Sequence, residues 1–314
     1  MAESRLDELR MVDPVLTTIV QGYSNSAMIA DKLFPHVSVK KLKGRIPVFG
    51  KEAFISRDSE RAIRAQSNRI APSGFDMVEF ETLERDLEIA LDYLEEEESP
   101  DFFRLEQRVA RELSDILALG KEADAAQLAQ DASAYPAGLK EALTADTAFD
   151  NYQSTSDPIT VIKDAMASLR GVIARYPNTL VLGESSYRAL IGHPKLTDRV
   201  KYSGLANVNL RTLAEILEIP NIYVGKAVTT TDGINFSDLW LDNAILAYVD
   251  RSEKSSEYNP SFGYIFRRES HPQIDSYYEN GGKIKVIRNT DNYCVKVTGR
   301  DAAYIITNTN QAGE

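Results

Sequence analysis

The stretch NTLVLGESSYRALIGHPKL, residues 178–196, places an apolar run directly before a glycine and a helical pattern. The run Thr179–Leu182 predicts a buried strand, and Gly183 predicts a sharp turn into a helix. Hydrolases also present a nucleophilic serine on a strand that turns sharply into a helix. The stretch is therefore either a strand-and-helix unit of a packed domain or an active site at Ser185 or Ser186.

The glycine and histidine content argues against the active site. A nucleophile elbow needs glycines on both sides of the serine, and Tyr187 stands where the second should be. The chain has three histidines; His193 and His271 each precede a proline. We expect the hydroxyls of Ser185 and Ser186 to satisfy free backbone N–H groups at the helix start. A serine-dependent hydrolase is kept as the alternative.

The composition is that of an ordinary globular protein, with 314 residues, 43% hydrophobic and 26% charged. A net charge of −11 argues against general nucleic-acid binding, because phosphate contacts need a cationic surface. The single cysteine, Cys294, excludes a disulfide within the chain. No apolar run approaches the ~18 residues of a membrane-spanning helix.

Helices and strands alternate around the opening stretch. Asp157-Pro158 starts a helix whose apolar residues form one stripe, and a second helix, NLRTLAEILEI, stops before the strand NIYVGKA. Two more strands are predicted in LWLDNAILAYV. This alternation predicts a mixed α/β domain.

The longest helix signal precedes that domain. Ser99, Pro100 and Asp101 are typical of a helix start, and apolar residues recur at helical spacing to about Ala132. At 1.5 Å per residue this predicts a rod of roughly 45 Å, suited to a spine that other elements lie across.

Residues 45–94 predict a long hairpin-like excursion. Two extended segments flank roughly two dozen mostly polar residues, and such a loop is improbable in a compact domain unless it docks on another molecule. Residues 51–70 carry five cations and three acids, whereas residues 79–101 carry eleven acids and only Arg85 as a cation. We expect loop arginines to contact an acidic face on a neighbouring copy. The loop arginines are Arg57, Arg61, Arg64 and Arg69, and the acidic face is Glu95, Glu96, Glu97 and Glu98. The alternative is a solvated loop beside an acidic turn.

After the α/β region the pattern is again extended, in GYIFRRES, QIDSYYE, KIKVIR, YCVKVTG and AAYIIT. We expect this sheet to pack against the long helix, which predicts an α+β fold with an inserted domain. GRIPVFGK lacks the spacing of a phosphate loop, and the chain contains neither G-x-G-x-x-G nor H-E-x-x-H. We predict no catalytic, cofactor or metal site, and a surface built for contact with protein.

The order of these parts resembles the major capsid proteins of tailed bacteriophages, which have the Hong Kong 97-type fold. The resemblance is carried by YPNTLVLGESSYRALIGHPKLTDRVKY, LAEILEIPNIYVGKA, LWLDNAILAYVD and PSFGYIFR, in that order. It implies an N-terminal arm, an extended β-hairpin loop, a long spine helix, a peripheral domain sheet and an inserted mixed α/β axial domain. The implied bounds are 1–44 for the arm, 45–94 for the extended loop, 95–145 and 260–310 for the peripheral domain with its spine helix at about 99–132, 146–259 for the axial domain, and 311–314 for the tail.

The resemblance also implies a function. Copies would form pentamers and hexamers of an icosahedral head around double-stranded DNA, without sequence-specific binding. The expected location is the virion, with the host cytoplasm during assembly. The long charged N-terminal extension that serves some relatives as a scaffold is missing, which implies either a separate scaffolding protein or cleavage of a longer precursor; Met1 favours the separate scaffolding protein. A portal protein is a further expected partner, and a decoration protein is an optional one. A bacterial nanocompartment shell, similar to encapsulins, is the alternative within this fold.

Overall fold

The computed structural model describes residues 11–12, 14–21, 28–47, 60–61, 66–69, 77–98, 102–153, 155–201, 208–251 and 261–310. The helices are α2 (Pro14–Gln21), α3 (Ala30–Leu33), α4 (Tyr93–Glu98), α5 (Phe102–Gln130), α6 (Pro158–Ile173), α7 (Glu184–Gly192), α8 (Pro194–Lys201) and α9 (Leu210–Leu217). The strands are β1 (Met11–Val12), β2 (His36–Val39), β3 (Lys43–Pro47), β4 (Met77–Glu81), β5 (Leu83–Asp92), β6 (Lys140–Ala142), β7 (Thr179–Gly183), β8 (Asn221–Gly225), β9 (Val228–Thr229), β10 (Ser237–Asp238), β11 (Ala244–Ala247), β12 (Gly263–Arg268), β13 (Gln273–Glu279), β14 (Ile284–Val297) and β15 (Ala303–Thr307).

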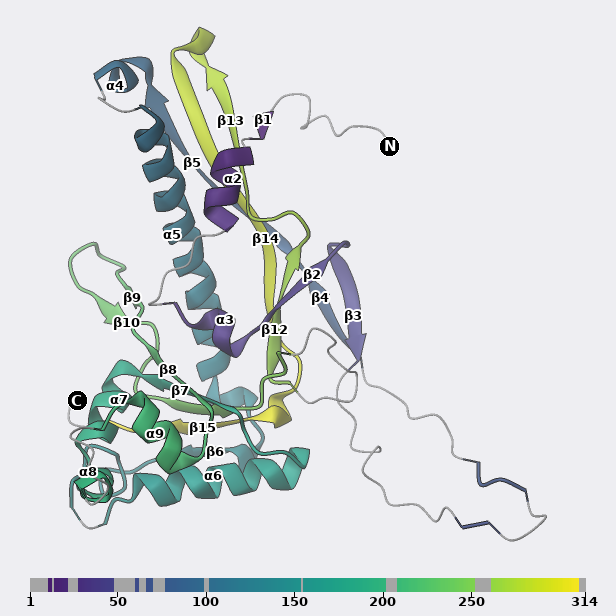
Figure 1. Ribbon diagram of the computed structural model, residues 1–314, viewed down its shortest axis with the longest axis vertical. Helices are drawn as coiled ribbons and strands as arrows, with labels where there is room; N and C mark the ends of the chain where they lie inside the picture. Colours follow the sequence, from purple (N-terminus) through teal and green to yellow (C-terminus); the bar gives the residue numbers. More distant parts are fainter. Residues whose placement is uncertain are drawn as a thin grey trace.

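Helix α5 forms the long axis of the molecule, and β5, β13 and β14 run beside it (Figure 1). Its 29 residues span roughly 44 Å, as the predicted spine requires. The predicted start at residues 99–101 lies outside the described residues. The helix ends at Gln130, two residues before the predicted end, because the Asp131 carboxylate accepts a hydrogen bond from the Ser133 N–H and caps a short 3-10 turn.

The sheet beside α5 has the order β1-β13-β14-β12-β2, and β5 pairs with the other edge of β14. Its pairings are antiparallel except that of β12 with β2. One face packs on α5, where Val109, Leu113, Ile274 and Ile287 are buried together. The predicted packing of the C-terminal strands on the long helix is confirmed.

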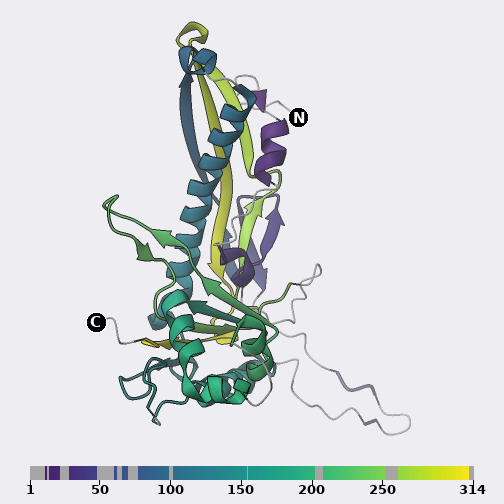
Figure 2. The ribbon, with the colours of Figure 1, turned by 60° about the vertical axis from the view of Figure 1, so that its left-hand side comes forward.

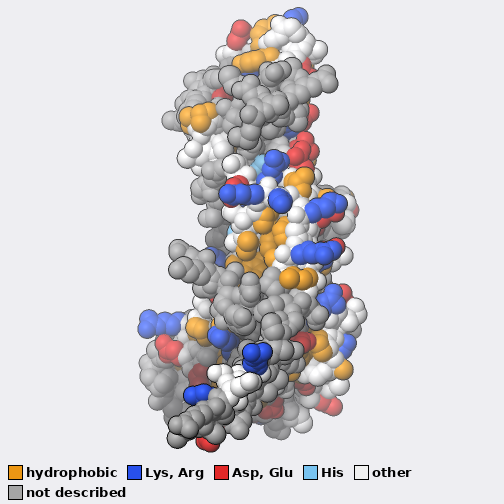
Figure 3. All heavy atoms as spheres, turned by 90° about the vertical axis from the view of Figure 1, so that its right-hand side faces the viewer, with side chains coloured by type: hydrophobic (Ala, Val, Ile, Leu, Met, Phe, Trp, Pro, Cys, Tyr) orange, Lys and Arg blue, Asp and Glu red, His pale blue; other side chains and the backbone are white. Residues whose placement is uncertain are grey.

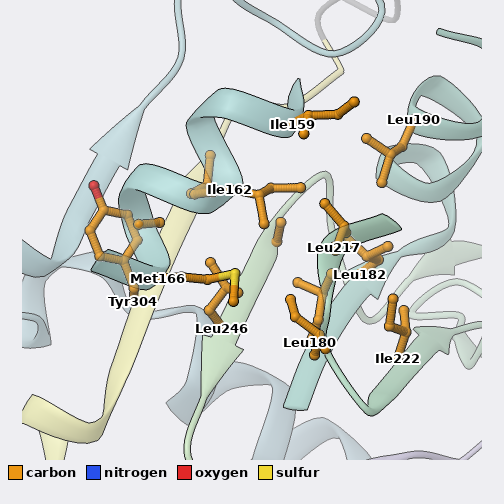
Figure 4. Close-up of a cluster of buried hydrophobic side chains, with 14 of the residues drawn as sticks. Ile159, Ile162, Met166, Leu180, Leu182, Leu190, Leu217, Ile222, Leu246 and Tyr304 are labelled. Carbon is orange, nitrogen blue, oxygen red and sulfur yellow. The ribbon is translucent and has the colours of Figure 1, made fainter. Parts of the chain in front are cut away.

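A second sheet, of order β6-β15-β11-β7-β8, occupies the lower part of the molecule in Figure 1. Helices cover both of its faces, and alternate residues of each strand belong to different cores. Leu180 and Leu182 pack against α6 and α9 (Figure 4), whereas Val181 packs with residues of α3 and α5. Burial on both faces explains why the opening run is continuously apolar rather than alternating.

This sheet corrects the predicted division of the chain. Strands β6 and β15 were assigned to the peripheral segments 95–145 and 260–310, but β15 pairs with β11 along its whole length. β6 in turn pairs with β15. The sequence showed that residues 303–307 form a strand, but strand pairing between distant segments leaves no local signal in the sequence.

Capping residues near the helix starts determine where the helices beside the second sheet begin. The Asp157 carboxylate accepts from the Thr160 N–H (3.3 Å) with Pro158 in the first turn, so α6 begins as predicted. Asn209 caps α9 through the Thr212 N–H (2.9 Å).

The described part of the N-terminal arm lies on the rest of the molecule. Leu16 of α2 is buried between α5 and β13, and the Ile274 N–H donates to the Thr17 hydroxyl (3.1 Å). Leu33 and Phe34 at the end of α3 are buried against α5 and the second sheet. Figure 2 shows the segments α2 and α3, drawn in purple, lying against the rest of the molecule.

Candidate assembly surfaces and the junction that supports them

The turn after β7 is shaped by packing. A Cβ atom on Gly183 would lie 1.7 Å from the Leu241 carbonyl oxygen, so only glycine fits there. Ser186 is fully buried; its hydroxyl donates to the Asn243 carbonyl oxygen (3.3 Å) and accepts from the Thr309 hydroxyl (2.5 Å). The prediction that Ser186 caps the helix is wrong, because its hydroxyl bonds to Asn243, directly before β11, and to Thr309, which follows β15.

His193 does not supply the base of a hydrolase. It is buried between α7 and α8, where its Nδ1 accepts from the Lys195 N–H (3.2 Å) and its ring meets Tyr152 edge-on. Burial lowers the pKa of its imidazole. Among the described interactions, Ser186 bonds only to Asn243 and Thr309, so no serine–histidine pair is assembled here.

The predicted acidic face is a short helix at the top of the molecule in Figure 1. Helix α4 follows directly on β5 and exposes Glu95, Glu97 and Glu98; Glu96 belongs to the same helix, but its side chain is outside the description. Glu95 accepts from the Asp92 N–H (3.3 Å), which fixes the turn between β5 and α4.

The predicted extended loop is rooted in an antiparallel hairpin. β3 pairs with β4 from Lys43 opposite Glu81 to Pro47 opposite Met77. Lys43 and Arg45 form cross-strand ion pairs with Glu81 and Glu79. Of the predicted contact residues, Arg61 and Arg69 are described and exposed, whereas Arg57 and Arg64 lie outside the described residues.

The hairpin and the acidic helix lie on different sides of one chain. β3 and β4 lie on the right in Figure 1 and α4 lies at the upper left, while β5, which begins one residue after β4 ends, runs from the hairpin up to α4. Figure 3 looks onto the hairpin side, where Lys and Arg side chains surround a hydrophobic patch at mid-height.

A groove opens between β5 and α5, below α4. Its volume is about 540 Å³. Its floor is apolar and its rim is mostly acidic, and the lining residues are Ile89, Ala90, Leu91, Glu95, Glu98, Leu105, Arg108, Val109 and Glu112. Sequence reasoning found the acids but missed the groove, because it depends on how the helix lies over the strand.

A buried carboxylate joins the arm, the long helix and the second sheet. Glu122 of α5 accepts from the N–H groups of Ile29 (2.9 Å) and Ala30 (2.8 Å) and from Trp240 Nε1 (2.7 Å). Burial raises the pKa of this carboxyl, while the three hydrogen bonds oppose the shift. Ala125 and Ala126 are also buried at this junction, where their small side chains let the arm and Trp240 approach the helix.

Beside this junction, Asp31 of α3 is in contact with a lysine and a histidine. Lys121 Nζ lies 2.8 Å and His36 Nε2 2.9 Å from Asp31 Oδ1. Burial alone would raise the pKa of Asp31, but the hydrogen bonds and charges of His36 and Lys121 hold it well below its usual range. Sequence reasoning missed Asp31 and Glu122, since neither stands in a recognisable motif.

The described residues contain no group of three or more His, Cys, Asp or Glu side chains that could hold a metal ion. Within the same residues, no helix is long and apolar enough to cross a membrane.

Known proteins are similar to this chain in sequence and in fold. A family model described as Phage major capsid protein E matches residues 134–259. The major capsid protein of Burkholderia phage BcepMu is 40% identical over 309 residues, which are 98% of this chain and 99% of that protein. The crystal structure of a phage-related protein from Bordetella bronchiseptica RB50 superposes with a TM-score of 0.79 and 29% identity, covering 96% of this chain and 98% of that one.

The fold extends to more distant capsids. A chain of the cyanophage P-SCSP1u capsid matches with a TM-score of 0.55 and 11% identity, covering 91% of this chain and 89% of that chain. The fold is therefore mixed α/β and resembles that of phage capsid proteins. The chain is a capsid shell protein and belongs to the family of phage major capsid proteins.

Proposed function

We propose that this chain adopts the Hong Kong 97-type arrangement and assembles as pentamers and hexamers into the icosahedral head that encloses the double-stranded DNA of a tailed phage. The observation that carries the proposal is the architecture around α5. A long spine supports one sheet, a second sheet closes one end, and the paired strands β3 and β4 project to the side (Figure 1). The full-length relationship to the BcepMu capsid protein supports the same conclusion.

The parts take the following roles in this proposal. The extended loop is the part of residues 45–94 that precedes β5, because β5 itself pairs with β14 in the sheet beside α5. Helix α5 is the spine of the peripheral domain, and the sheet containing β7, β8 and β11 is the core of the axial domain that meets its copies around symmetry axes. The loop arginines Arg57, Arg61, Arg64 and Arg69 reach the acidic face Glu95, Glu96, Glu97 and Glu98 of a neighbouring copy. The exposure of Arg61, Arg69 and the described glutamates supports this contact.

The protein acts as a structural element and not as an enzyme. It works with a scaffolding protein during assembly in the host cytoplasm, with a portal, and with a decoration protein where the head has one. The net charge of −11 suits a container wall that holds DNA without binding its sequence. A nanocompartment shell would use the same fold, and the 40% identity to a phage capsid protein favours the phage head.

Charge reversal in the loop tests the assembly contact. The variant Arg57→Glu/Arg61→Glu/Arg64→Glu should fold, as judged by circular dichroism, but should give few or no shells by electron microscopy, since repulsion replaces attraction at the contact. The control Lys163→Glu/Arg188→Glu/Arg211→Glu makes the same change of net charge in cations that form local ion pairs. An unchanged shell yield from the loop variant would contradict the proposed contact.

A further inference from the structure

We propose that the hairpin formed by β9 and β10 is an assembly element, whose apolar tip docks into a small groove on a second copy of this chain. The tip presents Ile234 and Phe236, and the groove lies at the C-terminal end of α5, beside the last residues of β14. The inference rests on the proposed function, because it assumes that copies of this chain assemble. It adds a contact that involves neither the extended loop nor the acidic helix α4.

The first observation is a pair of exposed, large apolar side chains. Ile234 is 79% and Phe236 74% exposed, the highest values among the large hydrophobic residues that the structure describes. Every residue from Thr230 to Asp238 is exposed, and the hairpin projects from the second sheet (Figures 1 and 2). Single apolar side chains are normal on a protein surface, whereas a group of them marks an interaction site.

The second observation is the fixed shape of the tip. The Asp232 carboxylate accepts hydrogen bonds from the N–H groups of Asn235 and Ile234 (both 2.8 Å) and from Asn235 Nδ2 (2.7 Å). These bonds hold the pKa of Asp232 well below its usual range. The ladder between β9 and β10 has only two residue pairs and would order the tip poorly by itself. The turn thus presents Ile234 and Phe236 in one arrangement, which lowers the entropy lost on binding.

The root of the hairpin is anchored in the core. Trp240, two residues after β10, is buried, and its Nε1 donates to Glu122 of α5. Gln130 of the same helix donates from Nε2 to the Leu239 carbonyl oxygen (2.9 Å) and accepts at Oε1 from the Leu241 N–H (2.8 Å). The hairpin therefore leaves α5 from a fixed position.

The third observation is a groove that suits this tip. Its volume is about 90 Å³, which suits one side chain rather than a length of chain. Tyr135, Phe262 and Val295 line it, and Leu128 beside them is 40% exposed. The rings of Tyr135 and Phe262 stack with centroids 6.1 Å apart. Phe236 of a second copy would add a third ring to this pair, and aromatic pairs stabilise contacts beyond the area that they bury.

Charge favours the hairpin tip as the occupant. The charged residues of the groove are Lys296, Arg300 and Asp131, so that two cations face one acid. The hairpin carries Asp232 and Asp238, and residues 227–239 contain no lysine or arginine. Opposite charges on the two surfaces speed their encounter and set the register of the contact.

The groove and the root of the hairpin lie on opposite sides of α5. Gln130 bonds to the root and Leu128 lines the groove, and side chains two positions apart on a helix point about 200° apart. In Figures 1 and 2 the hairpin and the lower end of β14 likewise lie on different sides of α5. The tip is thus placed to fill the groove of another copy, in a head-to-tail contact that can close into a ring.

Disulfide trapping in assembled shells tests the contact directly. Ser237→Cys is combined with Leu128→Cys in a Cys294→Ala background, which keeps both apolar side chains of the tip. Mild oxidation should link subunits into covalent dimers and longer chains on a non-reducing gel. The control pairs Ser237→Cys with Leu210→Cys, because Leu210 is 38% exposed, close to the 40% of Leu128. It should cross-link at least about tenfold more slowly, since a disulfide forms only between nearby Cβ atoms.

The outcomes separate the contact from the capsid function. Shells that form normally but cross-link no faster through Leu128→Cys than through Leu210→Cys would overturn the contact and leave the capsid function intact. A chain that forms no shell under any condition would contradict the proposed function, and the contact with it.

Removing the apolar tip gives a second test. Ile234→Ser/Phe236→Ser should fold, because both side chains are exposed, but should raise the subunit concentration needed for assembly at least about tenfold. The control Tyr176→Ser/Leu210→Ser removes two exposed apolar side chains elsewhere, 54% and 38% exposed. Equal effects of the two variants on assembly would contradict the contact. The cross-linking result decides the matter if the tip variant does not fold.

Discussion

Replacing Glu122 by alanine tests how the arm, the spine and the second sheet are held together. The fully buried carboxylate accepts three hydrogen bonds, from Ile29, Ala30 and Trp240, over 2.7–2.9 Å. Alanine leaves all three donors without an acceptor. Each buried donor without a partner costs about 1–3 kcal/mol, and water entering the space would recover part of this, so we expect a loss of roughly 3–6 kcal/mol in the free energy of unfolding.

Glutamine at the same position should cost less. Ile29 and Trp240 share Oε1, whereas Ala30 donates to Oε2. Glu122→Gln can keep the oxygen that serves two donors, and its amide group then faces the Ala30 N–H. We therefore expect a loss of about 1–3 kcal/mol, the cost of one unsatisfied buried donor.

Urea unfolding of the unassembled subunit at pH 7, followed by far-UV circular dichroism, measures both changes. Gln127→Ala is the control, because it shortens an exposed side chain of similar length on the same helix. Its free energy of unfolding should stay within about 0.5 kcal/mol of the wild type. If Glu122→Ala costs less than about 1 kcal/mol, the hydrogen bonds at Glu122 do not hold the junction and the reasoning fails.

Three further predictions follow from single sites. Gly183→Ala should destabilise the subunit by several kcal/mol, on the order of an overpacked core, because the added Cβ would lie 1.7 Å from the Leu241 carbonyl oxygen. Gly120→Ala is the control: nothing lies within 4 Å of its Cβ position, and it should stabilise the subunit by up to about 1 kcal/mol. A thermal melt in which Gly183→Ala is not the less stable of the two variants would refute the packing argument. The pKa of Asp31 is lowered in the fold, so its contribution to stability is present above the unfolded pKa of about 4 and is lost as the pH falls below it. The stability advantage of wild type over Asp31→Asn should therefore shrink between about pH 5 and pH 3, and a constant difference would contradict this sign. A fluorophosphonate probe should label neither Ser185 nor Ser186, since Ser186 is buried and bonded to Asn243 and Thr309; stoichiometric labelling would revive the hydrolase alternative.

Elements with local signals could be predicted from the sequence. The cap and proline at Asp157 and Pro158 set the start of α6, and the apolar run before Gly183 gave a buried strand. The paired segments that root the extended loop were also found, because extended patterns flank a polar stretch. In each case the determining residues lie within a few positions of the element that they define.

Features made by distant segments could not be predicted. β15 pairs with β11 although more than fifty residues of sequence separate the two strands. Ser186 likewise bonds to Thr309, which lies 123 residues further along the chain. Glu122 looks like any surface glutamate of an alanine-rich helix until Trp240 and the arm are placed beside it. The acidic composition around residues 79–101 indicated a contact surface, but only the structure showed a groove there.

The central claim is that copies of this chain build a closed head, and electron cryomicroscopy of particles assembled from the purified protein, with and without its scaffolding protein, tests it most directly. We expect closed icosahedral shells with five-fold and six-fold clusters of subunits, in which the extended loop of each copy contacts its neighbour. A protein that stays monomeric under every condition, scaffolding protein included, would contradict it.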